Sequence, residues 1–292
     1  MTLEQLRIFV AVAELEHVTK AAQRLNLTQS ATSAAIAALE ERYAIRLFDR
    51  IGRNIRLTDA GRQFLPEARA VLTRASSAEA ALSDFSGLKR GHINVAASQT
   101  AGNYWLPAPL YKFRKAYPGI TVELQIGNTE QVAHWVEAGQ ADLGVVEGDV
   151  DAPALSIQAI IEDELVLVVG PSHACARQRG LKPRELRDIE WVVREKGSGT
   201  RAVFEAALRD FGIALDEITI ALELPSNEAV RTAVQAGAGA TLISNLVASN
   251  ALRAGSLVRL SPALPNRRFF LLRHKERRVT PAEREFTAAL AG

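Results

Sequence analysis

A heptad pattern in the segment 58–88 constrains the fold of this chain more than any other feature. Apolar and small side chains recur there at alternating spacings of four and three residues: Phe64, Ala68, Val71, Ala75, Ala78, Leu82 and Phe85. This spacing places them on one face of an α-helix, as in a coiled-coil seam. A helix of this length would extend for roughly 45 Å. We expect its seam to pair with a second copy of the chain. The alternative is that it packs on its own domain.

The segments on either side of this helix differ in character. Residues 1–57 show short helical spacings, and 89–91 resemble a hinge. From residue 92 onward, apolar β-rich runs alternate with helical ones, which predicts an α/β fold with a largely parallel sheet. About 200 residues exceed one small nucleotide-binding unit, so we expect two lobes. The expected effector domain is 92–292, with lobe I at 92–162 and 268–292 and lobe II at 163–267.

Charge is distributed unevenly along the chain. The formal net charge is only +2 over 292 residues, which excludes an obviously polybasic chain. Residues 42–62, however, hold six arginines against two aspartates. This local excess favours contact with a polyanion, although a solvated helix and loop would also account for it.

Composition also restricts the compartment and the chemistry. A single cysteine, Cys175, excludes an internal disulfide and fits a reducing compartment. The N-terminus lacks the features of a signal peptide, and the uncharged runs 91–111 and 232–252 are too polar to cross a bilayer. We expect a cytoplasmic protein with no membrane partner. Phosphate-binding loops, nucleophile elbows and metal-ligand spacings are missing, so we expect no enzyme activity, no cofactor and no metal.

Residues 19–43 have the proportions of a helix-turn-helix. Residues 19–25 form the first helix, and Thr28 is a suitable N-cap for the second. We expect the second helix to bury one face, made of Thr32, Ile36, Leu39 and Tyr43. The opposite face carries small polar residues that can reach base edges in a major groove: Gln29, Ser30 and Ser33.

A basic turn follows this motif. Arg50, Arg53 and Arg56 are three residues apart around Gly52 and Asn54. Glycine and asparagine favour a turn between short strands, which predicts a wing. Guanidinium groups on such a turn can hold phosphates or enter a minor groove.

Three loops in the second half are rich in hydroxyl and amide groups, and each leads into a predicted helix. They are centred on 98–102, 127–129 and 197–201. Backbone N–H groups at a helix start, together with serine and threonine hydroxyls, can bind an anion. Each loop alone could simply cap its helix. Three loops at strand ends of one α/β fold favour a shared site instead.

Residues 1–61 resemble the winged helix-turn-helix of the LysR-type transcriptional regulators. The resemblance rests on LEQLRIFVAVAE, the run T-x-AA-x-x-L-N-L-TQS, LFDR at 47–50 and R-x-x-x-LT-x-AG at 53–61. It extends over essentially the whole chain. It implies a winged helix-turn-helix, a linker helix and a two-lobed effector domain similar to periplasmic binding proteins. The DNA-contacting residues implied are Thr19, Thr28, Gln29, Ser30, Ser33, Arg50 and Arg53. Capping is the alternative role of both threonines.

One departure from the family concerns base reading. Ala34 and Ala37 stand where longer polar or basic side chains are common in the family. Base reading therefore rests on fewer residues and on DNA shape.

The runs GNTE (127–130) and REKGSGTR (194–201) resemble the family branch that includes sulfur-assimilation and carbon-fixation regulators. This implies a small anionic effector, with a sulfur oxyanion such as sulfite favoured over a phosphorylated metabolite. The Glu147 carboxylate would disfavour the binding of an anion if it pointed into the cleft. The alternatives are that Glu147 pairs with Arg201 or that it selects a protonated ligand. The expected effector site consists of Ser98, Gln99, Thr100, Asn128, Thr129, Glu147, Ser198, Gly199, Thr200 and Arg201.

The sequence thus predicts a DNA-binding regulator that is a homodimer or homotetramer, with double-stranded promoter DNA and a small anion as partners. RNA polymerase is a further candidate partner. The rival hypothesis is an enzyme or a small-anion-binding protein whose N-terminal helices serve assembly only.

Overall fold

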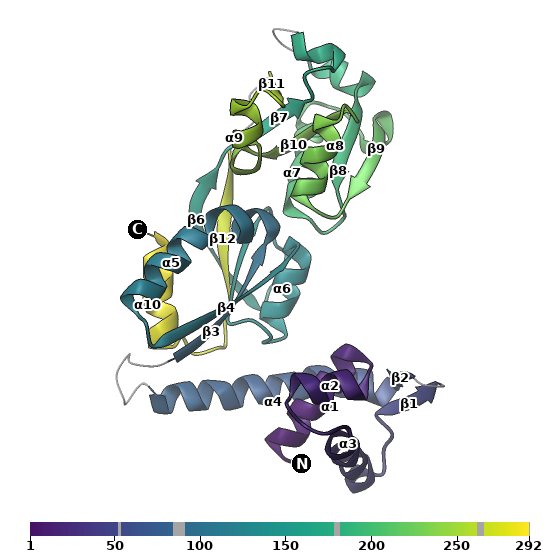
Figure 1. The fold of residues 1–292 in the computed structure, drawn as a ribbon, viewed down its shortest axis with the longest axis vertical. Helices are drawn as coiled ribbons and strands as arrows, with labels where there is room; N and C mark the ends of the chain where they lie inside the picture. The colour runs from purple at the N-terminus through teal and green to yellow at the C-terminus, as the bar shows by residue number, and fades with distance from the viewer. Residues whose placement is uncertain (52–53, 84–90, 178–181, 262–265, 292) are drawn as a thin grey trace. The chain divides into compact units, whose positions relative to one another are not determined.

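The computed structural model describes residues 1–51, 54–83, 91–177, 182–261 and 266–291. The chain forms two compact units, one ending with the helix α4 and the other beginning with the strand β3. The elements of the first unit are α1 (Leu3–Leu15), α2 (Val18–Arg24), α3 (Gln29–Tyr43), β1 (Phe48–Ile51), β2 (Asn54–Leu57) and α4 (Asp59–Ser83), shown in purple and blue in Figure 1.

Side-chain caps set where the first three helices begin. The Thr2 hydroxyl accepts from the backbone N–H of Gln5 at 3.1 Å at the start of α1. The Thr28 hydroxyl accepts from Ala31 N–H at 3.2 Å at the start of α3. Because a capping oxygen satisfies one of the otherwise unpaired N–H groups of the first turn, Thr2 fixes the start of α1 and Thr28 fixes the end of the turn between α2 and α3.

An aromatic cluster forms the centre of the first unit. The ring of Phe9 lies 5.5 Å from that of Phe48 and 5.0 Å from that of Phe64. These rings bring α1, β1 and α4 together, since tilted aromatic pairs at this separation are favourable. At Gly61 a Cβ would lie 2.2 Å from the carbonyl oxygen of Leu47, the residue before β1, so only glycine permits this close approach of α4.

The helix α4 only partly follows the expected seam. Ala68 is fully buried in the core of its own unit and Phe64 is partly buried there, so the alternative packing applies to the first part of the helix. Val71 is 42% exposed, and Ala78 is also exposed. The Leu82 side chain and Phe85 lie outside the described residues, as do residues 84–88 of the expected helix. The exposed part of the seam is therefore the part available to a partner.

The second unit contains two five-stranded sheets with helices on both faces. The order of the lobe I sheet is β4-β3-β5-β12-β6, and that of the lobe II sheet is β11-β7-β10-β8-β9. The strands are β3 (Gly91–Ser98), β4 (Ile120–Gly127), β5 (Leu143–Glu147), β6 (Leu155–Asp163), β7 (Leu165–Val169), β8 (Glu190–Arg194), β9 (Thr219–Leu224), β10 (Ala240–Ser244), β11 (Val258–Leu260) and β12 (Arg267–His274).

The expectation of a largely parallel sheet is wrong. In lobe I only the pairs β3–β4 and β3–β5 are parallel, while β12 runs antiparallel to both β5 and β6. In lobe II, β7 runs antiparallel to β10 and β11. The physical reason is that the chain passes from lobe I to lobe II after β6 and returns with β12, and the returning strand enters the first sheet in the opposite direction.

Alternation along the strands builds a core on each face of a sheet. In β3, Ile93 and Val95 contact one cluster, which includes Phe113 and Phe286, whereas Ala96 contacts the other. Successive strand residues point to opposite faces, so α5 and α10 cover one face of the lobe I sheet and α6 covers the other (Figure 1). Both faces of this sheet are therefore buried.

The helices of the second unit include one that the sequence did not predict, α9, which begins at its cap Ser244. Its bounds and those of the other helices are as follows: the π-helical turn η2 (Ala101–Trp105), α5 (Pro107–Ala116), α6 (Thr129–Glu137), the 3₁₀ turns η3 (Ala174–Arg177), η4 (Pro183–Asp188) and η5 (Leu215–Glu217), α7 (Gly199–Asp210), α8 (Asn227–Gln235), α9 (Asn245–Arg253) and α10 (Pro281–Ala291). Within the described ranges, no helix has the length and apolar character that a membrane span requires.

A buried ion cluster joins α10 to the lobe I sheet. Arg277 lies 2.6 Å from both Asp142 and Glu283, so one guanidinium serves two carboxylates. One oxygen of Glu283 is buried without a hydrogen-bond partner. Burial raises the pKa of the Glu283 carboxyl from 4.5 to about 7, against the lowering effect of Arg277. The folded lobe therefore favours the protonated acid.

We expect this acid to make the stability of the effector domain depend on pH. Because the pKa of Glu283 is raised on folding, its contribution to the free energy of unfolding is fully present below pH 4.5 and is lost as the pH rises through about 7. In Glu283→Gln this loss of up to about 3 kcal/mol should disappear. Urea unfolding followed by fluorescence measures it, since all three tryptophans lie in the second unit. The exposed Glu276→Gln is the control, and parallel pH profiles for Glu283→Gln and wild type would contradict the assignment.

Candidate functional site

The outward face of α3 carries the polar residues that the sequence assigned to base reading. Gln29 and Ser30 are exposed and Ser33 is partly buried, while Thr32, Ile36 and Leu39 form the inward face. The residues on the two faces follow from the helical period. The polar groups near the start of α3 are thus open to a ligand.

Tyr43 is not part of the buried face, contrary to the expectation. Its side chain is 49% exposed, and the guanidinium of Arg42 lies 5.7 Å from its ring centroid. The period places Tyr43 on the inward side, but α3 extends beyond the core at this point. The amphipathic pattern therefore overestimates the buried length of this helix.

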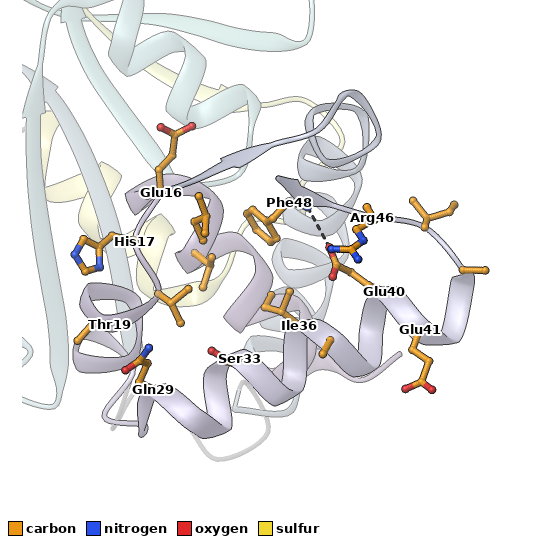
Figure 2. Close-up of a pocket in the computed structure, with 16 residues that line it drawn as sticks. Glu16, His17, Thr19, Gln29, Ser33, Ile36, Glu40, Glu41, Arg46 and Phe48 are labelled. Atoms are coloured by element: carbon orange, nitrogen blue, oxygen red, sulfur yellow. Dashed lines mark hydrogen bonds between the residues drawn. The ribbon is translucent and has the colours of Figure 1, made fainter. Parts of the chain in front are cut away.

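A groove of about 790 Å³ runs along α3 between α2 and β1. His17, Thr19 and Gln29 lie at one end, and Glu40, Glu41 and Arg46 lie at the other (Figure 2). The Glu40 carboxylate accepts from the backbone N–H groups of Leu47 and Phe48 at 2.7 and 3.1 Å. Glu40 thus fixes the start of the hairpin β1–β2 relative to α3.

The residues predicted to contact phosphates lie in α2, at the start of α3 and in the hairpin segment. Thr28 caps α3, which was the alternative role considered for it. Thr19 is exposed in α2, whose N-cap is His17. Arg50 belongs to β1, but its side chain and the whole of Arg53 lie outside the described residues.

The three hydroxyl-bearing loops of the second unit come together. Ser98 ends β3 and Thr100 follows it, Thr129 begins α6 after β4, and Thr200 is at the start of α7 after β8. All four side chains are buried. The carboxyl ends of these strands meet where the lobes join, which is where α/β folds bind ligands.

Glu147, at the end of β5, lies at the centre of this convergence. Its carboxylate accepts hydrogen bonds from the hydroxyls of Ser98, Thr100 at 3.0 Å and Thr200 at 3.5 Å. Its backbone oxygen accepts from Thr129 at 2.9 Å. Hydroxyl donors from both lobes therefore meet at one carboxylate.

Arg267, at the start of β12, supplies the positive charge at this point. It donates to Asp163 at 2.7 Å and to the Thr200 hydroxyl at 3.0 Å, and it lies 3.8 Å from the Glu147 carboxylate. Burial raises the pKa of Asp163, against the lowering effects of Arg267 and of the Ser244 hydrogen bond. Neither Arg267 nor Asp163 was predicted, although each is a charged residue at the end of an apolar strand.

Arg201 does not reach this cluster. It bonds to Glu205 at 2.6 Å, to Glu223 at 3.4 Å and to the backbone oxygen of Arg194. The alternative that Arg201 pairs with Glu147 is therefore wrong, because the side chain leaves α7 toward the strands β8 and β9. Arg267 fills the role instead.

Asn128 and Gln99 also lie away from Glu147. The Asn128 amide donates to Glu195 at 3.4 Å, and its oxygen accepts from Gln131 N–H. Gln99 exchanges hydrogen bonds with the backbone of Pro225 and Asn227. Since Glu195, Pro225 and Asn227 belong to lobe II, Asn128 and Gln99 each link the lobes.

Close packing holds the lobes together at Gly199. A Cβ on Gly199 would lie 1.9 Å from the backbone oxygen of Glu147.

Tyr104 of lobe I donates to Glu228 of lobe II at 2.6 Å, and burial together with that hydrogen bond raises the pKa of Tyr104 to about 12. The tyrosine thus remains a donor at physiological pH.

A cleft of about 600 Å³ opens beside this junction, between α6 and the start of α7. Ser198 lines it with a side chain that is only 3% exposed. Within the described part of the chain its hydroxyl has no hydrogen-bond partner, and α7 has no side-chain cap. A donor is thus left for a ligand at the positive end of a helix. Across all the residues that the structure describes, no cluster of His, Cys, Asp and Glu side chains could hold a metal ion.

Comparison with known proteins agrees with this arrangement. Residues 3–62 match the family model "Bacterial regulatory helix-turn-helix protein, lysR family", and residues 86–292 match "LysR substrate binding domain". A probable RuBisCO transcriptional regulator of Cyanidioschyzon merolae is 38% identical over 83% of this chain and 81% of that protein.

Two solved structures share the fold. Full-length CbnR complexed with its target DNA is 25% identical and has a TM-score of 0.71 over 99% of each chain. The regulatory domain of Synechocystis PCC6803 CcmR in complex with 2-PG is 26% identical and has a TM-score of 0.63, covering 69% of this chain and 96% of that one.

The fold and the two sites define a DNA-binding protein with an effector domain. This chain belongs to the LysR family of transcriptional regulators. The predicted family, winged helix-turn-helix and two-lobed effector domain are confirmed, as is the similarity to carbon-fixation regulators. The alternative that this chain is an enzyme is set aside, because the family and the relatives similar to this chain are transcriptional regulators.

Proposed function

We propose that this regulator reads DNA with α3 and the wing, and that a small anion bound where the lobes meet controls it. One observation carries the second part: hydroxyl groups from three loops converge at the start of α7, next to Arg267. Helix starts and hydroxyl donors favour anions. The favoured effector is a sulfur oxyanion such as sulfite, and a phosphorylated metabolite is second. The CcmR domain in complex with 2-PG supports a small-molecule effector for this fold.

The DNA-contacting set that we propose is Thr19, Thr28, Gln29, Ser30, Ser33, Arg50 and Arg53. Gln29 and Ser33 line the groove of α3, where an amide and a hydroxyl can bond to base edges. The wing arginines contribute phosphate or minor-groove contacts. Promoter DNA is the partner in this proposal, which fits a protein of the cytoplasm.

Pairing of two chains is the second element of the proposal. The exposed Val71 and Ala78 continue the heptad seam toward Leu82 and Phe85. A dimer would present two reading helices to two half-sites of one operator. We extend the proposal to a homodimer that assembles further into a tetramer, and to contact with RNA polymerase at the promoter.

Two kinds of substitution should separate base reading from phosphate binding. Gln29→Ala and Ser33→Ala should lower the preference for an operator, selected by the wild-type protein from random duplexes, about tenfold or more. Arg53→Ala should weaken binding to all duplexes and reduce the salt slope by about 1. Fluorescence anisotropy measures both, with the exposed Arg209→Ala in α7 as the control for lost charge. Unchanged operator preference in the α3 variants would refute base reading by this face.

Charge in the seam should separate the chains. Val71→Asp combined with Leu82→Asp should give monomers, because it places like charges opposite each other in an apolar interface. Sedimentation velocity measures the mass of the full chain. Arg74→Asp introduces the same residue at an exposed position of α4 outside the seam and should leave the dimer intact. Dimers that persist in the double variant would exclude this helix as the interface.

A further inference from the structure

The carboxylate of Glu147 occupies the point at which an anionic effector would be bound. Its side chain is 2% exposed. One oxygen accepts from Ser98, and the other accepts from Thr100 and Thr200. The hydroxyl donors of the proposed site are therefore already used by an anion that belongs to the protein.

The number of protons at this site limits what can bind. Each hydroxyl has one proton to donate. When Ser98, Thr100 and Thr200 turn their protons toward a ligand, Glu147 loses three hydrogen bonds while it remains buried. A buried carboxylate without donors is strongly unfavourable. A ligand that only accepts hydrogen bonds thus destabilises the site that it enters.

The charges at the junction restrict the ligand in the same way. Two charged groups from other elements act on Glu147: Arg267 of β12 and Asp163 at the end of β6. Arg267 is shared between both carboxylates. Arg201 is paired with Glu205 and Glu223, and Arg194 with Glu195. A fully deprotonated oxyanion would add further negative charge beside two carboxylates that share one guanidinium.

Resting on the anion site proposed above, we propose that Glu147 selects an effector that carries a proton on its acidic group, as hydrogensulfite does, and excludes fully deprotonated oxyanions such as sulfate. The ligand donates its own proton to Glu147. Its remaining oxygens accept from the hydroxyls of Ser98, Thr100 and Thr200. The donors that Glu147 gives up are thereby replaced by one from the ligand.

Calorimetric titration of the full chain with sodium sulfite and sodium sulfate, under nitrogen, tests this selection. The wild type should bind sulfite, with an affinity that falls as the pH rises from mildly acidic to mildly alkaline. It should bind sulfate at least about tenfold more weakly, which corresponds to about 1.4 kcal/mol. In Glu147→Gln the amide can donate as well as accept, so sulfate affinity should rise about tenfold and the pH dependence for sulfite should flatten.

The matched control is Glu276→Gln, an exposed carboxylate of the second unit that lies outside this cleft and away from Glu147. It should leave both affinities unchanged. Equal binding of sulfite and sulfate by the wild type, or an unchanged ratio in Glu147→Gln, would overturn selection by Glu147 and leave the anion site standing. Failure of both proteins to bind either anion would overturn the anion site as well. Sulfate binding by Glu147→Gln alone would support exclusion by Glu147. If that variant does not fold, the pH dependence of wild-type sulfite binding decides.

Discussion

The compensation of buried charge where the two lobes meet is the constraint on which the effector domain depends. Glu147 and Asp163 are almost inaccessible to water, and Arg267 is the guanidinium that lies beside both. Removing one member of such a group leaves a buried charge that costs several kcal/mol. The cluster therefore holds β5, β6 and β12 in register and draws the loops after β3 and β8 toward it. Ligand binding and lobe arrangement consequently involve the same atoms.

This arrangement gives a physical basis for control. A ligand that accepts hydrogen bonds from the hydroxyls that otherwise donate to Glu147 changes the hydrogen bonds that cross between the lobes, including those of Thr200 and Gly199. The arrangement of the lobes can shift only as far as the ligand binds the two arrangements with different affinity. An internal carboxylate at the binding point raises that difference, because its interactions change when a ligand arrives. The same group thus contributes to selectivity and to the response.

Much of the site could be predicted from the sequence because the loops that follow β3, β4 and β8 lie at carboxyl ends of strands, and these ends meet where the two lobes join. Ser98, Thr100, Thr129 and Thr200 come together for this reason. Arg201 and Asn128 have other partners, since spacing along the chain does not fix where a long side chain points. Arg267 lies 104 residues from Asp163, and no local pattern links two residues so far apart.

The fold was predictable to a similar extent. Periodicity located the helices of the first unit and the strands of the second. It also assigned Tyr43 to the buried face of α3, which ends before that residue. The return of the chain as β12 made the lobe I sheet mixed, and β7, the first strand after the crossing into lobe II, made the other sheet mixed. Neither crossing between the lobes has a sequence signal. The helix α9 was missed because its buried stripe, Val247, Ala248 and Ala251, is short and mostly made of small residues, whereas its cap Ser244 was a usable sign.

Control by an effector requires that the effector site and the DNA-reading helices α3 of the paired chains are coupled. The most direct measurement is the affinity of the full chain for its selected operator, by fluorescence anisotropy, with and without saturating sulfite, together with calorimetric sulfite affinity for free and operator-bound protein. We expect sulfite to change operator affinity, and the operator to change sulfite affinity by the same factor. Sulfite that binds the protein yet leaves operator affinity unchanged would contradict this coupling.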